Sequence, residues 1–207
     1  MGIVGRVGRV GKNEILVATT NAGKLREIRR ILHDTPVSLR TLDDFPHVPI
    51  PEETGATFAE NARQKALHYA GVTGMLTMAE DSGFEVDALN GEPGIYSARY
   101  LREDATYDER FADIYRRARE IGSTERSARF VCALAVAHRG DVVFETTATV
   151  EGLLAEKPAG PNGFGYDPIF FYPPYGKTFG EASDEEKTAV SHRGLAICAF
   201  RDYLLRT

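Results

Sequence analysis

The stretch from Phe130 to Ala137 is almost wholly apolar. Such a run suits a β-strand that is covered on both faces, as in sheets flanked by helices. Arg139-Gly140-Asp141 is a turn signal, and Val142 to Val150 is expected to return as the hairpin partner of the apolar strand. This part of the chain therefore predicts a sheet whose central strand is buried between layers.

Strands and helices alternate in the first part of the chain. Ile15 to Ala18 is a short apolar run typical of a buried strand, and Thr57-Phe58-Ala59-Glu60 has the spacing of a capping box that opens a helix through about Ala70. A second strand is expected from Leu76 to Ala79, ending at the turn-like Glu80-Asp81-Ser82-Gly83. A further helix is expected directly after the first strand. Thr20 or Asn21 would be its N-cap, and its apolar stripe is Leu25, Ile28, Ile31 and Leu32.

Prolines and helical patterns complete the outline. Pro36 and the series Pro46, Pro49 and Pro51 predict an irregular segment, and Ser183 with Glu186 forms a second capping-box pattern. A third helix is indicated by Phe111, Ile114, Tyr115 and Ala118, and a last helix, from about Gly194, is expected to bury Leu195, Ala199, Tyr203 and Leu204 or their neighbours. The alternation of strands and helices, followed by a hairpin, predicts an α/β protein with a mixed sheet.

Bulk composition narrows the class of protein. The 207 residues suffice for one large domain or a two-lobed single domain, and 43% apolar residues support an ordinary core. No apolar run approaches the ~20 residues of a membrane span, and the net charge of −5 argues against broad nucleic-acid binding. Cys132 and Cys198 lie in apolar runs, which indicates buried reduced thiols in a cytoplasmic protein.

Residues 1–13 form a separate case. They alternate Gly, Val and Arg without a periodicity that could bury a face, so we expect a flexible N-terminal extension, with the domain spanning 14–207. Gly11-Lys12 resembles the end of a phosphate-binding loop. The spacing fails, however, because Arg6 stands where glycine is needed and Asn13 replaces the Ser or Thr that would hold magnesium.

The sequence TTNAGK at 19–24 lies between the first strand and its helix. Free amides at a helix start attract anions, Gly23 allows a phosphate close to the backbone, and Lys24 supplies a positive charge. Phosphate binding is one interpretation of this loop. An ordinary capped helix with a solvated lysine is the other.

Carboxylates follow the next strand. Glu80 and Asp81 lie where α/β proteins commonly place ligands, and Glu52 and Glu53 form another acidic pair. Magnesium prefers a few carboxylate oxygens together with water and phosphate, although an isolated EDSG is equally typical of an acidic surface turn. Asn61 and Lys65 lie four residues apart, hence on one helix face, where they could line the same site or simply face solvent.

The segment from Gly163 to Gly194 combines aromatic rings, a carboxylate and cations. It contains the strings GFGYDPIFF and EEKTAVSHRG. Rings can stack on a base, polar edges can read it, and cations can neutralise phosphates, whereas core packing would explain only the rings. We interpret this segment as half of a nucleotide-binding site.

Several ordered motifs resemble those of the inosine triphosphate pyrophosphatase family, which removes non-canonical purine nucleoside triphosphates. The resemblance runs from Ile15 to the C-terminus. Its motifs are TTNAGK at 19–24, EETGATFAENARQKA at 52–66, EDSGFEVDALNGEPGIYSARY at 80–100, GFGYDPIF at 163–170 and EEKTAVSHRG at 185–194. Many motifs in one order make the resemblance specific.

The resemblance implies an elongated, two-lobed α/β domain with a central, strongly twisted mixed sheet flanked by helices and a cleft between the lobes. It implies a homodimer and Mg²⁺-dependent hydrolysis of ITP, dITP or XTP to the monophosphate and pyrophosphate. A pyrophosphatase for other modified nucleotides and a non-catalytic nucleotide-binding protein are the alternatives.

The resemblance also assigns roles to residues. Asp81 would be the general base and a metal ligand, and Glu52 would be a second metal ligand in preference to Glu53. Glu80 stands where many members have Asp, so its longer side chain could alter a metal distance. The nucleotide would be contacted by Thr19, Thr20, Asn21, Ala22, Gly23, Lys24, Ser82, Phe164, Gly165, Tyr166, Asp167, Lys187, His192 and Arg193.

Overall fold

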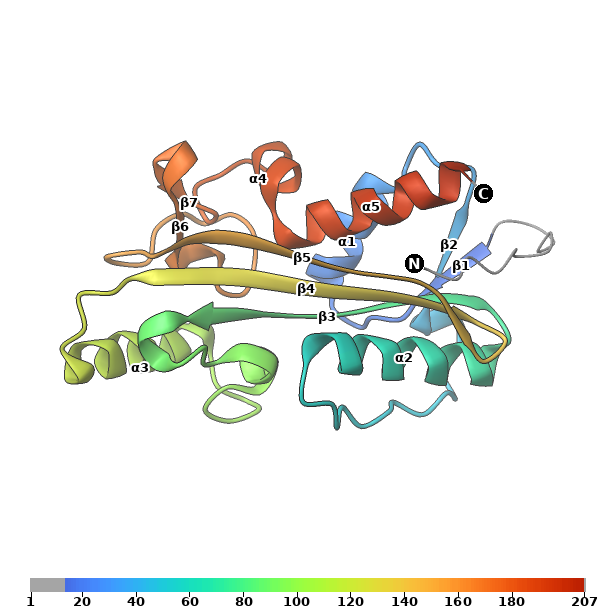
Figure 1. Cartoon of the computed structure of the whole chain (residues 1–207), viewed down its shortest axis with the longest axis horizontal. Coiled ribbons are helices and arrows are strands. Elements are labelled where there is room, and N and C mark those ends of the chain that lie inside the picture. Colours follow the sequence, from blue (N-terminus) through green and yellow to red (C-terminus); the bar gives the residue numbers. More distant parts are fainter. Residues whose placement is uncertain (1–13, 207) are drawn as a thin grey trace, which may run out of the picture. The chain divides into compact units, whose positions relative to one another are not determined.

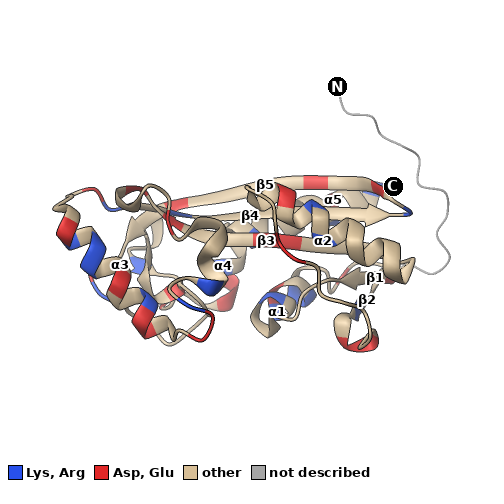
Figure 2. Ribbon diagram, turned by 90° about the horizontal axis from the view of Figure 1, so that it is seen from below, with Lys and Arg blue, Asp and Glu red and all other residues tan. Residues whose placement is uncertain are grey.

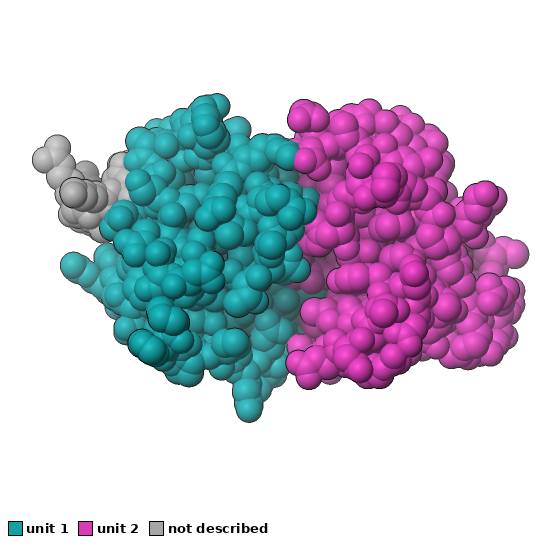
Figure 3. Space-filling model, turned by 180° about the vertical axis from the view of Figure 1, so that it is seen from behind, with its two compact units in different colours: residues 1–81, 132–148, 193–207 teal, residues 82–131, 149–192 magenta. Residues whose placement is uncertain are grey.

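The computed structural model describes residues 14–206, and the expectation for residues 1–13 lies outside them. The chain forms two compact units (Figure 3). Unit 1 comprises the chain up to Asp81 together with Cys132–Ala148 and the segment from Arg193, and unit 2 comprises Ser82–Val131 and Thr149–His192. None of the helices in the described range is long and apolar enough to cross a membrane.

Seven strands form one mixed sheet in the order β2-β1-β3-β4-β5-β6-β7, which confirms the predicted α/β class. β1 is parallel to both β2 and β3, whereas β6 is antiparallel to β5 and to β7. The strands are β1 (Glu14–Val17), β2 (Ser38–Thr41), β3 (Leu76–Val86), β4 (Ser127–His138), β5 (Asp141–Leu154), β6 (Phe170–Tyr172) and β7 (Lys177–Thr178).

Five α-helices and five short 3-10 helices complete the described chain (Figure 1). The helices are α1 (Ala22–Ile31), α2 (Phe58–Thr73), α3 (Tyr107–Ile121), α4 (Asp184–Val190) and α5 (His192–Arg206). The side chain of Asn21 caps α1 and that of Thr57 caps α2, while Thr106 and Ser183 begin α3 and α4 with complete capping boxes. The caps at Asn21, Thr57 and Ser183 were all predicted.

Unit 1 has α2 on one face of its strands and α5 on the other (Figure 1). Alternate residues of β4, namely Cys132, Leu134 and Val136, belong to the core that α1 and α5 complete with Ile28, Ile197 and Phe200. α2 lies on the opposite face (Figure 1), and its Ala62 and Ala66 are buried. β4 is therefore covered on both faces in this unit, as its apolar run predicted.

Unit 2 has its own aromatic core. The rings of Phe84 and Tyr166 are stacked, with centroids 5.3 Å apart, and Phe130 lies 4.9 Å from Phe170. The outer side of α3 carries charges of both signs (Figure 2), among them the pairs that Arg116 makes with Asp113 and Glu120. α3 is thus an amphipathic helix with its apolar side on this core.

Two predictions about elements are wrong, and a third is confirmed in part. β3 does not end at a turn: it continues through Glu80–Gly83 to Val86, because Phe84 and Val86 have a buried core to enter. The proline-rich segment, predicted to be irregular, contains β2. This strand pairs in parallel with β1 and forms one edge of the sheet. In α5 the neighbours Ala196, Ile197 and Phe200 are buried, and the predicted Tyr203 and Leu204 are partly buried against the same core. Leu195, which is 44% exposed, and Ala199 do not belong to this stripe.

Candidate active site

The carboxyl end of β1 and the neighbouring middle part of β3 mark the first part of the site. After β1 the chain enters α1 and pairs as β2 on one side, and after α2 it pairs as β3 on the other side. Loops diverge at such a switch point and leave room for a ligand beyond the strand ends. The last residue of β1, Val17, pairs with Met78, so Glu80 and Asp81 come just after this pairing.

The predicted phosphate loop lies at this switch point. Thr20, Asn21 and Ala22 are exposed, and α1 begins at Ala22. The side chain of Asn21 accepts a hydrogen bond from the Lys24 amide at 3.1 Å, while its own amide donates to the Thr19 hydroxyl at 3.2 Å. These bonds fix the loop at the start of α1, where first-turn amides lack intrahelical acceptors. The geometry suits an anion.

Glu80 is a buried carboxylate at the centre of an ionic network. The guanidinium of Arg193 donates to Glu80 through Nε at 2.7 Å and also pairs with Glu27 at 2.7 Å. Lys24 Nζ lies 3.5 Å from Glu80, and the Cys132 thiol donates to it at 3.2 Å. Burial alone would raise the pKa of Glu80, but Arg193 and Lys24 outweigh burial and hold this pKa well below its usual range. Glu80 is therefore an ionised anchor near neutral pH.

Asp81 has different neighbours. The Asn61 side-chain amide donates to Asp81 at 3.0 Å, and Lys65 Nζ lies 3.7 Å from the other carboxylate oxygen. The same ammonium donates to Glu53 at 2.7 Å. Burial raises the pKa of Asp81 above its usual value, a shift that Lys65 and Asn61 reduce without reversing. A carboxylate of raised pKa is a better proton acceptor than an ordinary one.

The structure separates the two acidic residues before α2. Glu53 is half-buried and shares Lys65 with Asp81, whereas Glu52 is exposed and makes no ion pair within residues 14–206. Ser82, which follows Asp81 on β3, is also half-buried. The side chain associated with Asp81 through Lys65 is therefore that of Glu53.

The unit 2 part of the predicted site is a buried ion pair beside a ring. Lys187 Nζ lies 2.6 Å from Asp167 and 4.5 Å from the centre of the Phe164 ring. The other role of Asp167 is local, because its carboxylate accepts a hydrogen bond from the Phe164 amide at 2.7 Å. Gly163 has a φ of +72° and an added Cβ would lie 2.1 Å from the Asp167 carboxylate, so only glycine fits there. Lys187 and Asp167 thus shape the Gly163–Asp167 turn.

Two predicted nucleotide contacts lie within the core of unit 2. Tyr166 is 4% exposed, stacks on Phe84 and donates from its hydroxyl to the Ser97 carbonyl at 2.9 Å. His192 is 3% exposed, and its ring stacks on Phe130 with centroids 4.7 Å apart. Phe164 and Gly165 are more accessible than either of them.

Sequence reasoning undervalued three residues. The sequence leaves open whether Asn61 and Lys65 line the site or face solvent, and it gives no role to Glu27, yet each of the three contacts a central side chain of unit 1. The spacing of Asn61 and Lys65 was the available signal for two of them. Glu27 carries no comparable signal, since only the tertiary fold brings it to Arg193.

The unit 1 cluster has few metal ligands of its own. Across residues 14–206, no group of three or more His, Cys, Asp or Glu side chains is arranged to hold a metal ion. Asp81 and Glu53 offer oxygen donors on either side of Lys65. This donor set suits Mg²⁺, which commonly takes one or two carboxylates and completes its shell with water and substrate phosphates.

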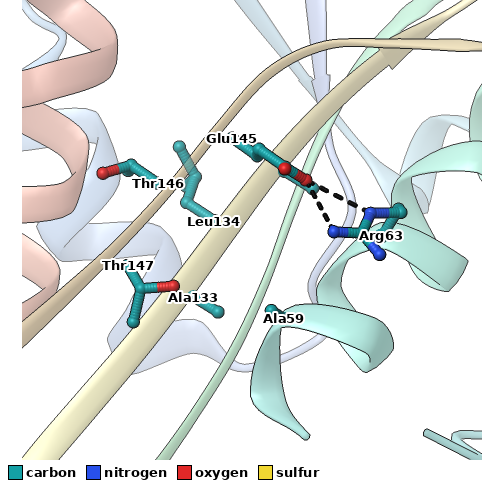
Figure 4. A pocket seen from close by; sticks show the side chains of 8 residues that line it. Ala59, Arg63, Ala133, Leu134, Glu145, Thr146 and Thr147 are labelled. Atoms are coloured by element: carbon teal, nitrogen blue, oxygen red, sulfur yellow. Dashed lines mark hydrogen bonds and ion pairs between the residues drawn. The ribbon is translucent and has the colours of Figure 1, made fainter. Parts of the chain in front are cut away.

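A separate pocket of about 230 Å³ lies elsewhere in unit 1, between α2 and the β4-β5 hairpin (Figure 4). Its wall carries the exposed Arg63–Glu145 pair, with a shortest distance of 2.9 Å. Its lining is Ala59, Arg63, Ala133, Leu134, Ala135, Glu145, Thr146 and Thr147, none of which is a predicted site residue.

Comparisons with known proteins identify the family of the chain. The chain is 44% identical to a dITP/XTP pyrophosphatase of Geobacter sulfurreducens over 190 residues, covering 92% of this chain and 96% of the relative. It is 46% identical to a dITP/XTP pyrophosphatase of Thermus thermophilus, covering 90% and 89%. A solved HAM1 protein from Coxiella burnetii superposes with a TM-score of 0.88 at 38% identity, covering 94% and 99%. Because the Ham1 family profile also matches residues 15–203, this chain belongs to the Ham1 family.

Proposed function

We propose that this protein hydrolyses non-canonical purine nucleoside triphosphates, namely ITP, dITP and XTP, to the monophosphate and pyrophosphate. Family membership supports the reaction class, because similar chains are dITP/XTP pyrophosphatases. The observation that carries the proposal is Asp81, a buried carboxylate of raised pKa beside Lys65 and next to an anion-binding helix start. Such a site combines a base with positive groups for phosphates.

Asp81 would remove a proton from the attacking water. The water oxygen forms a bond to the α-phosphorus, the bond from that phosphorus to the bridging oxygen breaks, and pyrophosphate leaves. Amides at the start of α1 and the ammonium of Lys24 would bind the phosphates. Lys24 is held near Glu80 at 3.5 Å, so its position is fixed before the substrate arrives.

Asp81 and Glu53 are the residues that would hold Mg²⁺. Glu53 is preferred to Glu52, the ligand that the resemblance implied, because Glu53 shares Lys65 with Asp81 and Glu52 is exposed. When bound, the ion would neutralise charge on the phosphates and the leaving pyrophosphate. Lys65 would keep the two carboxylates from repelling each other when the ion is absent.

The purine would be bound by the unit 2 cluster. Phe164 offers a partly accessible ring, and the Lys187–Asp167 pair fixes the turn that carries it. Hydrogen-bond donors of the protein would face the 6-oxo group of hypoxanthine or xanthine. Adenine has an amino group at this position, so these donors would lose their acceptor, at a cost of about 1–3 kcal/mol for each buried group. Arg193 would bind Glu80 and Glu27 and would not contact the base, because both carboxylates contact its guanidinium directly.

The working form is proposed to be a cytoplasmic homodimer. The reduced cysteines Cys132 and Cys198 fit a reducing compartment. Light scattering after gel filtration measures the mass of the particle, and a monomer at micromolar concentration would contradict the dimer.

A substrate panel tests the function. Pyrophosphate release is measured with Mg²⁺ from ITP, dITP and XTP, with ATP, GTP and modified pyrimidine triphosphates as controls. The proposal expects the three non-canonical purines to be preferred by at least 10-fold in kcat/KM. Preference for a modified pyrimidine would show a different pyrophosphatase, and binding without release would show a nucleotide-binding protein.

A further inference from the structure

Asn61 joins two parts of unit 1 that carry the proposed chemistry. It lies on the first turns of α2 and is 0% exposed. Its side-chain nitrogen donates to Asp81 Oδ2 at 3.0 Å, and its side-chain oxygen accepts from the Gly55 amide at 2.8 Å. One amide therefore contacts the proposed base on β3 and the loop that follows Glu52 and Glu53.

The loop approaches Asn61 closely. A Cβ at Gly55 would lie 2.7 Å from Asn61 Oδ1 and 2.7 Å from the Cβ of Glu60, so a side chain at position 55 requires the loop to shift. Gly55 lies only two residues after Glu53. The loop is tied a second time, because the Ala56 amide donates to Glu60 at 2.7 Å.

The two hydrogen bonds of Asn61 have opposite polarity. An asparagine satisfies both because it carries one acceptor and one donor group on the same planar amide. An aspartate of the same size would accept from Gly55 but could not donate to Asp81 while ionised, and a leucine could do neither. The pattern at this buried position is therefore specific to an amide.

We propose that Asn61 is a positioning residue that fixes Asp81 relative to the Glu53-bearing loop and so sets the spacing of the two carboxylates that serve the reaction. The inference rests on the proposed function for its kinetic consequence. A misplacement of about 1 Å in a reacting group can cost about 100-fold in rate, and groups that orient metal ligands typically contribute 10–100-fold.

Asn61→Asp and Asn61→Ala separate the two bonds. Asn61→Asp keeps the loop contact and loses the bond to Asp81, whereas Asn61→Ala loses both. Gln64→Ala is the matched control, because Gln64 is an exposed amide on the same helix that meets the Thr54 hydroxyl at only 3.4 Å. Circular dichroism and a thermal melt establish the folded fraction of each variant.

Kinetics measure the effect on the carboxylates. We expect Asn61→Asp to lower kcat with dITP by 10–100-fold and to raise the Mg²⁺ concentration for half-maximal rate, with KM at saturating Mg²⁺ changed less than 3-fold. Gln64→Ala should match the parent protein. A purely structural Asn61 would change the folded fraction and leave kcat per folded molecule intact, and that result would overturn the inference.

Hydrogen exchange supplies a readout that needs no turnover. The Gly55 amide should exchange at least 10-fold faster in Asn61→Ala than in the parent, while Asn61→Asp and Gln64→Ala retain protection. An inactive parent protein would contradict the proposed function, and the exchange pattern would still decide the inference. Unchanged protection of Gly55 in Asn61→Ala would overturn it.

Discussion

Glu80 and Asp81 are neighbours on β3, but their environments shift the pKa values of the two carboxyl groups in opposite directions. Glu80 contacts Arg193, Lys24 and Cys132, and its pKa is held low. Asp81 contacts Asn61 and Lys65 of α2, and its pKa is raised by burial. Successive strand residues face opposite sides of a sheet, which explains how adjacent residues meet different helices.

The opposite pKa shifts indicate a structural role for Glu80 and a chemical role for Asp81. A carboxylate that is ionised at every physiological pH and fully paired is a poor base but a firm anchor. A buried carboxylate with a weaker set of partners remains able to take a proton. The side of Glu80 therefore holds unit 1 together, and the side of Asp81 is where catalysis is proposed to occur.

Replacing Asp81 with Asn should produce the largest effect. The variant loses the proton acceptor, so kcat with dITP should fall by about 10²–10⁴-fold. Stability near neutral pH should be unchanged or slightly higher, because the ionised form of Asp81 is disfavoured by burial. Steady-state pyrophosphate release and a thermal melt measure both, and kcat within 3-fold of the parent would remove Asp81 from its role.

Replacing Glu80 with Gln should chiefly reduce stability. Arg193 would keep a buried charge without its main partner, a loss of about 3–5 kcal/mol in the free energy of unfolding. Urea denaturation measures this loss. If the variant is as stable as Asp81→Asn, the two sides of β3 do not differ as described.

Acid should act on the Glu80 side. A carboxyl whose folded pKa lies below the ordinary 4.5 contributes stability above that pH and loses it as the pH falls toward the folded pKa. The parent protein should therefore lose stability below about pH 4.5, and Glu80→Gln should lose less over the same range. Urea midpoints between pH 7 and pH 3 test this, and parallel curves for the two proteins would count against it.

The smallest effect is expected at Cys132. Its thiol donates to Glu80 at 3.2 Å, so Cys132→Ala should cost about 1 kcal/mol for the bond, with some added loss from the buried sulfur volume, and leave kcat within 2-fold. Cys198→Ala, at a partly buried site on α5, is the control and should change less. Equal destabilisation by the two changes would show that the bond to Glu80 is unimportant.

Local signals predicted much of this fold. The helix caps at Asn21, Thr57 and Ser183 can each be predicted from a few neighbouring residues, and the apolar run of β4 is sufficient to predict that this strand is buried. β3 was ended too early because Asp81-Ser82-Gly83 is typical of a turn, and only the aromatic core around Phe84 shows why the strand continues.

The site was harder to predict than the fold. The motifs located Lys24 and Asp81, but the partners of Arg193 could not be deduced, since Glu80 and Glu27 lie more than a hundred residues earlier in the chain. Likewise, Glu52 and Glu53 are indistinguishable as letters. Their difference arises from which one reaches Lys65 on α2.

The alternation along β3 makes the order Glu80-Asp81 as important as the two side chains themselves. Insertion or deletion of one residue upstream in this strand would move every following side chain to the other face of the sheet. Glu80 would then point toward α2, and Asp81 would point toward Arg193. Point substitutions in this strand can be graded in effect, whereas a single-codon length change at the same place would interchange the two environments at once.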